Sequence, residues 1–337
     1  MSDQFLELPP DEQAQILNTL SLQLGRTSVI LEKDIWICWL LEQLFSMPNR
    51  LKMAFKGGTS LSKVFNMIQR FSEDVDLTID YRDFNQDFDP FNTDVSKTQI
   101  KKFNDCLRVH VKHHTYEKVI PHLRSQLNDQ FPAKKFKIKS DENGEKVYLY
   151  YPSVIEDMNN YVGNHILLEF GGRNITEPNT LCNIQPDIAL ILPDLIFPVV
   201  QANVLSVIRT FWEKATLIHA LCNQIYWKDS LERKSRHWYD LAMLAKNSMG
   251  EKALLDKQML MDVVKHKNIF FHAPHANYSS CLIGNIKLVP QNKGMHEGLK
   301  ADFKKMLESG MFYGKEPVFN EIIEQLGVLE KTINHAV

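Results

Sequence analysis

Two short segments contain the residue types that a bound nucleotide and its metal ion require. One is a Gly-Gly turn, Gly57-Gly58, and the other is an Asp-x-Asp pair, Asp74 and Asp76. Adjacent glycines let the backbone approach a phosphate closely, and a helix start offers unpaired N–H groups with positive partial charge. Carboxylates two positions apart on an extended segment project to the same side, where their hard oxygens suit Mg²⁺. The combination indicates phosphoryl or nucleotidyl transfer.

The spacing of the glycines excludes two common phosphate-binding loops. Gly57, Gly58 and Lys63 do not form the GxxxxGK[ST] loop, and the Rossmann GxGxxG pattern does not fit either. The order strand, Gly-Gly, helix, Asp-x-Asp strand is that of nucleotidyltransferases. There one ion can orient the triphosphate while another activates the attacking hydroxyl. Either feature alone is better explained as a simple turn or as two surface aspartates, but together they favour the functional interpretation.

Four later residues are further candidates, each with a simpler alternative. Glu169, in an apolar run, is the candidate third metal carboxylate on a neighbouring strand, although it can also lie on a solvated face. Arg173 can meet a phosphate oxygen or pair with an acid. Lys214 lies on an apolar helix, where an ammonium needs a partner such as a triphosphate unless it reaches solvent. Asp240 can form an ion pair with Arg236, one turn earlier.

Hydropathy periodicity predicts the elements that must position these residues. Apolar spacing of three and four predicts helices, and alternation of polar and apolar residues predicts half-buried strands. Residues 178–198 contain several prolines and are expected to be irregular and partly extended. The predicted helices are 10–24, 28–47, 60–70, 96–131, 209–227 and 233–249, and the predicted strands are 53–55, 74–79, 134–139, 147–151, 165–170 and 286–289.

Composition limits the possible partners and the location. The 337 residues have a net charge of -2, so any nucleic-acid surface must be local. The basic segment Lys97–Lys139 is the candidate RNA surface, with its histidines and Tyr116 available to stack on bases; the alternative is a solvated helix face. The five cysteines are dispersed, with no CxxC pair, and we find no signal-like start and no membrane-spanning apolar run. We therefore expect a cytoplasmic protein with no membrane partner.

Four motifs together resemble one family. They are Lys56-Gly-Gly-Thr-Ser-Leu-Ser-Lys63, Phe71-Ser-Glu-Asp-Val-Asp76, Phe211-Trp-Glu-Lys214-Ala-Thr and Arg236-His-x-x-Asp240-Leu241. They are similar to those of the AbiEii/AbiGii group, toxin-type nucleotidyltransferases of bacterial abortive-infection and toxin–antitoxin systems that are related to the MenT toxins. Similar elements near both ends of the chain, beginning at Glu32 and Asp302, extend the resemblance over nearly its whole length.

The resemblance implies an α+β fold. Its core would be polymerase-β-like, a small mixed sheet with flanking helices, followed by a mostly helical C-terminal region. We expect residues 1–200 to form the N-terminal helices and the core, with a basic helical insertion near 94–140. Residues 201–337 would form a helical domain that contributes the Lys and Asp motifs to the cleft.

The resemblance also implies an activity. An NTP and Mg²⁺ would be used to transfer a nucleotide to an RNA 3′ end, in some relatives the tRNA acceptor end, in phage defence or a toxin–antitoxin system with an antitoxin encoded nearby. Glu169 is assigned by no family motif. The implied roles are phosphate binding for Lys56, Gly57, Gly58, Thr59, Ser60 and Lys63, metal binding for Asp74 and Asp76, triphosphate contact for Lys214, and the acid of the last motif for Asp240. Two alternatives remain, namely nucleotidyl transfer to a protein hydroxyl and a nucleotide-binding interaction module without catalysis.

Overall fold

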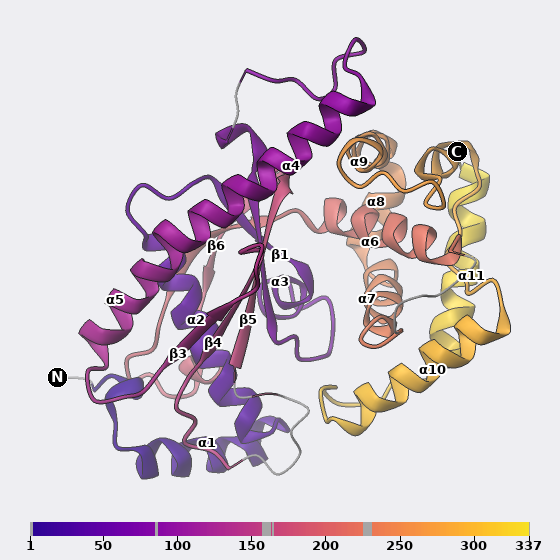
Figure 1. Cartoon of the computed structure of the whole chain (residues 1–337). Helices are drawn as coiled ribbons and strands as arrows, with labels where there is room; N and C mark the ends of the chain where they lie inside the picture. The colour runs from indigo at the N-terminus through magenta and orange to yellow at the C-terminus, as the bar shows by residue number, and fades with distance from the viewer. Residues whose placement is uncertain (1–2, 85–86, 157–162, 164, 225–230, 337) are drawn as a thin grey trace. The chain divides into compact units, whose positions relative to one another are not determined.

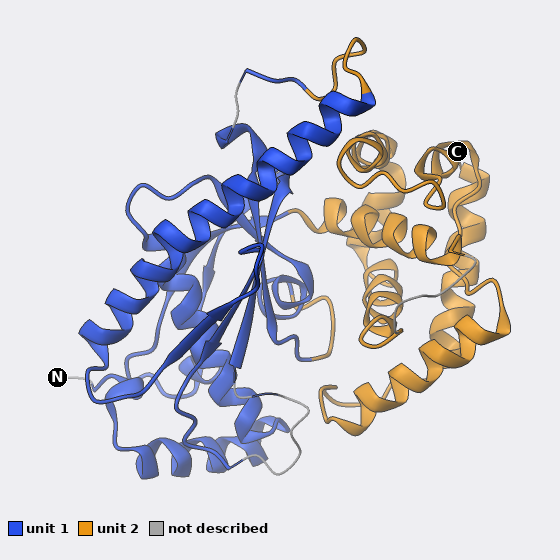
Figure 2. Cartoon of the chain, viewed as in Figure 1, with its two compact units in different colours: residues 1–65, 71–89, 97–205 blue, residues 66–70, 90–96, 206–337 orange. Residues whose placement is uncertain are grey.

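A computed structural model describes residues 3–84, 87–156, 163, 165–224 and 231–336 (Figure 1). The chain divides into two compact units (Figure 2). Unit 1 consists of Met1–Phe65, Phe71–Asp89 and Lys97–Leu205, and unit 2 consists of Asn66–Arg70, Pro90–Ser96 and Ser206–Val337. Among the described residues, none of the helices combines the length and apolar character that crossing a lipid bilayer requires.

Unit 1 is built on a mixed seven-stranded sheet with the strand order β3-β4-β5-β2-β1-β7-β6. β2 pairs in parallel with β5, and β1 pairs in parallel with β7, whereas the other neighbours are antiparallel. The strands are β1 (Met53–Lys56), β2 (Asp74–Asp80), β3 (Lys137–Ser140), β4 (Lys146–Tyr150), β5 (His165–Asn174), β6 (Asn179–Ile184) and β7 (Val200–Leu205).

The two faces of this sheet differ in polarity. Val75, Leu77, Leu168 and Phe170 alternate along β2 and β5 and are buried. The side chains between them point the opposite way because successive residues of a strand alternate in direction. On β4 and β5 this second set is only partly buried or exposed. We call it the open face.

The helices of unit 1 are α1 (Pro10–Leu24), α2 (Ser28–Ser46), α3 (Gly57–Lys63), α4 (Lys97–His114) and α5 (Ile120–Gln130), with a π-helical turn (Thr115–Val119) joining the last two. α4 packs on the buried face of β5, where the side chain of Val111 lies so close to Gly172 that a Cβ there would be 2.1 Å from it. α2 is buried almost throughout, including its charged residues. Its apolar stripe therefore belongs to the core of unit 1.

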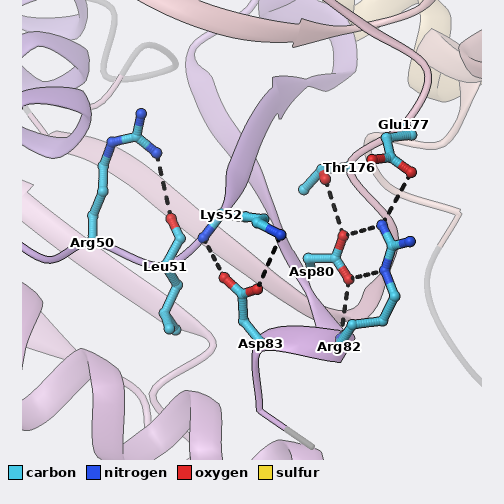
Figure 3. Close-up of polar contacts among 8 residues, drawn as sticks. All are labelled: Arg50, Leu51, Lys52, Asp80, Arg82, Asp83, Thr176 and Glu177. Carbon is cyan, nitrogen blue, oxygen red and sulfur yellow. Dashed lines mark hydrogen bonds and ion pairs between the residues drawn. The ribbon is translucent and has the colours of Figure 1, made fainter. Parts of the chain in front are cut away.

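The C-terminal end of β2 is fixed by the carboxylate of Asp80 (Figure 3). Asp80 is 1% exposed and accepts hydrogen bonds from Arg82 Nε at 2.7 Å and Nη2 at 2.5 Å and from Thr176 Oγ1 at 3.1 Å. Burial acts to raise the pKa of Asp80, but these bonds and the charge of Arg82 outweigh it, so the pKa is lowered. Arg82 also bonds Glu177, so one arginine ties β2 to the segment after β5.

Unit 2 consists of helices α6 (Val207–Cys222), α7 (Ser235–Ala245), α8 (Ser248–Leu255), α9 (Lys257–Phe270), α10 (Lys293–Glu308) and α11 (Phe319–Ala336). Buried tryptophans link them, since the indole of Trp212 donates to the Ala253 carbonyl and that of Trp238 donates to the Leu288 carbonyl. Asp302 of α10 accepts from the N–H of Ser235 at 2.9 Å, which caps the start of α7.

The expected α+β fold, with a mixed sheet and a helical C-terminal region, is confirmed. Two local predictions are wrong, and two strands were not predicted. The helix after the Gly-Gly turn ends at Lys63 because the Phe65 N–H turns back to the Ser60 carbonyl and Asn66 takes a positive φ of 50°. Residues 286–289 are not a strand. β6 lies within residues 178–198, which were expected to be irregular and partly extended, and β7 follows them; neither was predicted as a strand. The last three residues of the predicted helix 209–227 lie outside the described residues.

Candidate active site

The Asp76 carboxylate lies against the N-terminus of α3. β1 runs directly into α3 at Gly57, whose φ is +81°. A Cβ at Gly57 would be 1.9 Å from Asp76 Oδ2, so only glycine leaves room for the carboxylate. Positive φ and lack of space together explain the glycine at this position. The chain thereby brings an acid to the end of a helix where backbone N–H groups and positive partial charge are concentrated.

The hydroxyl groups of the turn hold the backbone in place. Thr59 Oγ1 lies 3.0 Å from the Ser72 carbonyl oxygen and also contacts the Asp74 carbonyl oxygen. Ser60 Oγ donates to the Gly57 carbonyl at 3.0 Å, and both hydroxyl-bearing residues are buried. Thr59 therefore ties α3 to the start of β2. Phosphate binding by this turn remains a prediction, and it would fall to backbone N–H groups.

One row of charged residues crosses the sheet at Asp76. In the strand register, Lys56 of β1 lies opposite Asp76, and Asp76 lies opposite Glu169 of β5. Glu169 in turn lies opposite Lys146 of β4. Residues paired in register project to the same face, so the structure places Glu169 beside Asp76. Glu169 also forms an ion pair with Lys146 at 3.1 Å, and this carboxylate raises the pKa of Lys146.

The donor set can be compared with what a magnesium ion requires. Among residues whose positions are described, no group of three or more His, Cys, Asp or Glu side chains is arranged to hold a metal ion. Mg²⁺ commonly binds through one or two carboxylates together with substrate phosphates and water. Asp74 and Asp76 project to one side of β2 beside a helix N-terminus, which fits that chemistry. The third ligand predicted, Glu169, has a lysine partner here, and its metal role remains a prediction.

Three consecutive charges on α2 hold the segments around these acids. The ammonium of Lys33 pairs with Glu73 at 2.8 Å, with side-chain exposures of 1% and 7%. Asp34 pairs with Lys63 at 2.5 Å. Glu32 accepts from the N–H of Val154 at 2.7 Å; burial raises the pKa of Glu32, although this hydrogen bond opposes the rise. Glu73 directly precedes Asp74 and Lys63 ends α3, so α2 fixes both sides of the turn.

Lys63 has a different environment from the one expected for a phosphate ligand. Its ammonium lies between the carboxylates of Asp34 and Asp187, at 2.5 Å and 3.1 Å, and its side chain is 5% exposed. Asp187 also pairs with Arg26 and donates its backbone N–H to Asp34 at 2.8 Å. The structure therefore gives Lys63 a role in positioning α3. Phosphate binding by Lys63 remains a prediction.

The predicted residues of unit 2 form a buried cluster around Asp240. Arg70 Nε and Nη2 bond the two carboxylate oxygens, each at 2.8 Å, and Lys214 Nζ bonds Oδ2 at 2.8 Å. Asp240 is fully buried; burial acts to raise its pKa, but Arg70 and Lys214 lower it well below the usual range. The sequence suggested Arg236 as a partner of Asp240, and the bonds described here come from Arg70 and Lys214. Lys214 is thus held by a carboxylate of its own unit.

Arg173 lies near the end of β5, where the register with β2 shifts between Gly171 and Asn174. Burial lowers the pKa of Arg173, the charge of Arg108 acts in the same direction, and Glu145 opposes both. Such a guanidinium remains charged because the ordinary pKa of arginine is above 12. Its contact with a phosphate remains a prediction.

The sequence did not predict the buried ion pairs made by Lys33, Glu73 and Arg70. A signal for Lys33 was present, because Glu-Lys-Asp is followed directly by Ile-Trp-Ile-Cys-Trp on one helix. Charges within such an apolar run must be paired when the helix is buried. Arg70 carried no comparable local signal, since its partner Asp240 is far away along the chain.

Comparison with known proteins identifies the family of this chain. Residues 39–325 match the family described as nucleotidyl transferase AbiEii toxin, type IV TA system. Among solved structures, the nucleotidyltransferase toxin MenT4 from Mycobacterium tuberculosis H37Rv is similar with 16% identity, 98% coverage of each chain and a TM-score of 0.45. A search of curated proteins gives no match. Because the family match spans most of the chain, this protein belongs to the AbiEii family of nucleotidyl transferase toxins of type IV toxin–antitoxin systems.

Proposed function

We propose that this nucleotidyltransferase transfers a nucleoside monophosphate from an NTP to the 3′-hydroxyl of an RNA, with tRNA as the preferred acceptor. The observation that carries the proposal is the contact between the Asp76 carboxylate and Gly57 at the N-terminus of α3. It puts an acid that can hold a cation beside backbone N–H groups that can hold phosphate oxygens. A triphosphate bound with its metal ion needs both in one place.

Asp74 and Asp76 are the residues that would hold Mg²⁺. When bound, the ion neutralises charge on the phosphates and favours ionisation of the attacking hydroxyl. The N–H groups at the start of α3 would bind the phosphate oxygens and stabilise the negative charge that develops there. The 3′-oxygen forms a bond to the α-phosphorus, the bond to the bridging oxygen breaks, and pyrophosphate leaves with that electron pair. The hydroxyl proton passes to solvent. Triphosphate contact by Lys214 stays a prediction from its motif.

An antitoxin is implied by membership of a type IV toxin–antitoxin family. We propose that the toxin acts in the cytoplasm, where tRNA is available. Direct binding between toxin and antitoxin is not required by this proposal, because an antitoxin can also act by repressing expression.

The test is incubation of the purified full chain with total RNA, Mg²⁺ and each of the four labelled NTPs, followed by sequencing of the labelled ends. We expect RNA to be labelled and Asp76→Ala to lower the rate by at least about a hundredfold, the scale of removing one electrostatic catalytic group. Glu308→Gln is the control, since its side chain is 62% exposed on α10.

Three outcomes would contradict the proposal. Wild-type rates from a folded Asp76→Ala variant would exclude Asp76 as a catalytic residue. Label on candidate proteins added to the reaction, and not on RNA, would show transfer to a protein hydroxyl. Binding of NTP with no metal-dependent turnover on any acceptor would show a binding module without catalysis.

A further inference from the structure

The open face carries three aromatic rings and two lysines on adjacent strands. The His165 ring lies with its centroid 5.5 Å from that of Tyr148 and 5.2 Å from that of Tyr150. The ammonium of Lys139 lies 5.5 Å from the Tyr150 centroid, within cation–π distance. We call this group the aromatic–lysine surface; it consists of Lys137, Lys139, Tyr148, Tyr150 and His165.

The strand register explains why these side chains share one face. Lys137 pairs with Tyr150, Lys139 pairs with Tyr148, and Tyr150 pairs with His165. β3, β4 and β5 are neighbours in the sheet (Figure 1). Val147 and Leu149, the neighbours of Tyr148 along β4, point to the opposite face and are both 1% exposed. The tyrosines are thus excluded from the core that their own strand forms.

Both lysines are exposed, and the three rings are partly exposed. Tyrosine is common on strands, but three rings and two lysines grouped on one partly exposed face also form a surface that a ligand can contact. The surface is also close to the candidate metal ligands. In the strand register, Tyr148 lies opposite Leu167, and Leu167 lies opposite Asp74. The backbones of Tyr148 and Asp74 are therefore two strand spacings apart, about 10 Å.

We propose that the aromatic–lysine surface binds the single-stranded 3′ end of the acceptor RNA, with bases stacked on Tyr148 and Tyr150 and phosphates held by Lys137 and Lys139. This inference rests on the proposed function. Exposed rings can stack on bases only where the bases are not paired in a duplex, and lysines select a polyanion. None of the five residues of the surface is acidic, so its charge is complementary to the RNA backbone.

The basic helices that the sequence suggested for this role fit less well. On α4, His110 stacks on Phe84 with centroids 5.5 Å apart, and His114 is buried. Tyr116 donates its hydroxyl proton to the Asp141 carbonyl at 2.9 Å. The rings of His110 and His114 are therefore poorly placed to stack on bases, whereas Tyr116 is 40% exposed. The strands are the better candidates because Tyr148 and Tyr150 lie two positions apart on one face, where successive bases can stack.

The test is fluorescence anisotropy of a 5′-labelled single-stranded oligoribonucleotide ending in unpaired bases, bound to the full chain without NTP or metal. We expect the double variant Tyr148→Val, Tyr150→Val to weaken binding by about tenfold or more, since one stacked base contributes about 5- to 150-fold. Glu308→Gln is the control and should bind like the wild type. Tyr116→Leu tests the helices, and a loss of binding in it as large as in the double variant would overturn the choice of the strands. Valine keeps the β-propensity, and circular dichroism checks the fold.

Two further measurements separate stacking and charge. Lys137→Ala and Lys139→Ala should each reduce the slope of log affinity against log salt by about 0.7. In turnover assays the tyrosine variants should raise KM for RNA and leave KM for NTP unchanged. Equal RNA binding by the wild type and the double tyrosine variant would overturn the inference, as would equal affinity for a blunt duplex. Because binding is measured without turnover, absence of transfer to RNA would contradict the proposed function alone.

Discussion

Replacing Gly57 by alanine would place a methyl group where the Asp76 carboxylate meets α3. The added Cβ would be 1.9 Å from Asp76 Oδ2, 2.7 Å from Cγ and 3.0 Å from Cβ. Ordinary contact begins at 3.4 Å, so the carboxylate oxygen must move by about 1.5 Å. The substitution therefore displaces a candidate metal ligand without removing it.

The expected loss of activity follows from that displacement. Misplacing a reacting or ligating group by about 1 Å can cost about a hundredfold in rate, so kcat/KM should fall by at least about a hundredfold. The positive φ of +81° adds backbone strain of about 1–2 kcal/mol for any residue with a Cβ. The loss of activity in Gly57→Ala should thus greatly exceed what its modest loss of stability explains.

Gly25→Ala is the matched control. Gly25 follows α1 with a φ of +62°, and no atom lies within 4 Å of a Cβ built there. The two variants share the cost of a left-handed alanine and differ in the contact with Asp76. Gly25→Ala should lose about 1–2 kcal/mol, the cost of the left-handed conformation alone, and keep wild-type activity.

The assay combines NTP incorporation into RNA with thermal unfolding followed by circular dichroism. A folded Gly57→Ala variant with activity within about threefold of the wild type, a difference below 1 kcal/mol, would refute a role for Asp76 at this position. Equal losses of activity in both glycine variants would trace the effect to stability instead.

Three further predictions concern buried charges. Lys33→Met removes the ammonium that pairs with the buried carboxylate of Glu73, so denaturant unfolding should show a loss of about 3–5 kcal/mol, and adding Glu73→Leu should recover much of it. Asp240→Asn leaves two buried cations with a neutral partner and should lower stability by a similar 3–5 kcal/mol in the same assay; an unchanged midpoint would contradict the cluster geometry. The folded-state pKa of Asp80 is lowered, so its contribution is present above the unfolded value of about 3.9 and is lost as pH falls through the folded value. Melting temperature measured from pH 6 to pH 2 should therefore fall less steeply below pH 4 in Asp80→Asn than in the wild type (Figure 3).

The turn and its acids could be predicted because their signals are local. Two glycines before a short polar helix and alternation from Asp74 to Ile79 specify a strand, a turn, a helix and a strand, and the structure contains all four. The interpretation of Glu169 as a residue on a strand neighbouring the aspartates also agrees with the register. Its pairing with Lys146 did not follow from the sequence, since it depends on the hairpin register of β4 against β5.

Other features depended on contacts between distant segments. β6 and β7 pair with one another and β7 joins β1, yet the prolines around them hide their alternation. The length of α3 is set by the turn after Lys63, and the two carboxylates on Lys63 come from α2 and from the segment after β6. The sequence alone therefore could not show that Lys63 is paired with carboxylates, because both partners come from distant segments.

The three charges of α2 show how a positioning role can be told apart from a catalytic one. Successive helix residues are rotated by about 100°, so Glu32, Lys33 and Asp34 must face three different directions. In the structure they bond three different segments: the backbone at Val154, the residue before Asp74, and the end of α3. Removing one of them loosens the support of the turn, so activity and stability should fall together. Gly57→Ala moves one carboxylate on an intact support, so activity should fall far more than stability, and that difference identifies which residues form the site.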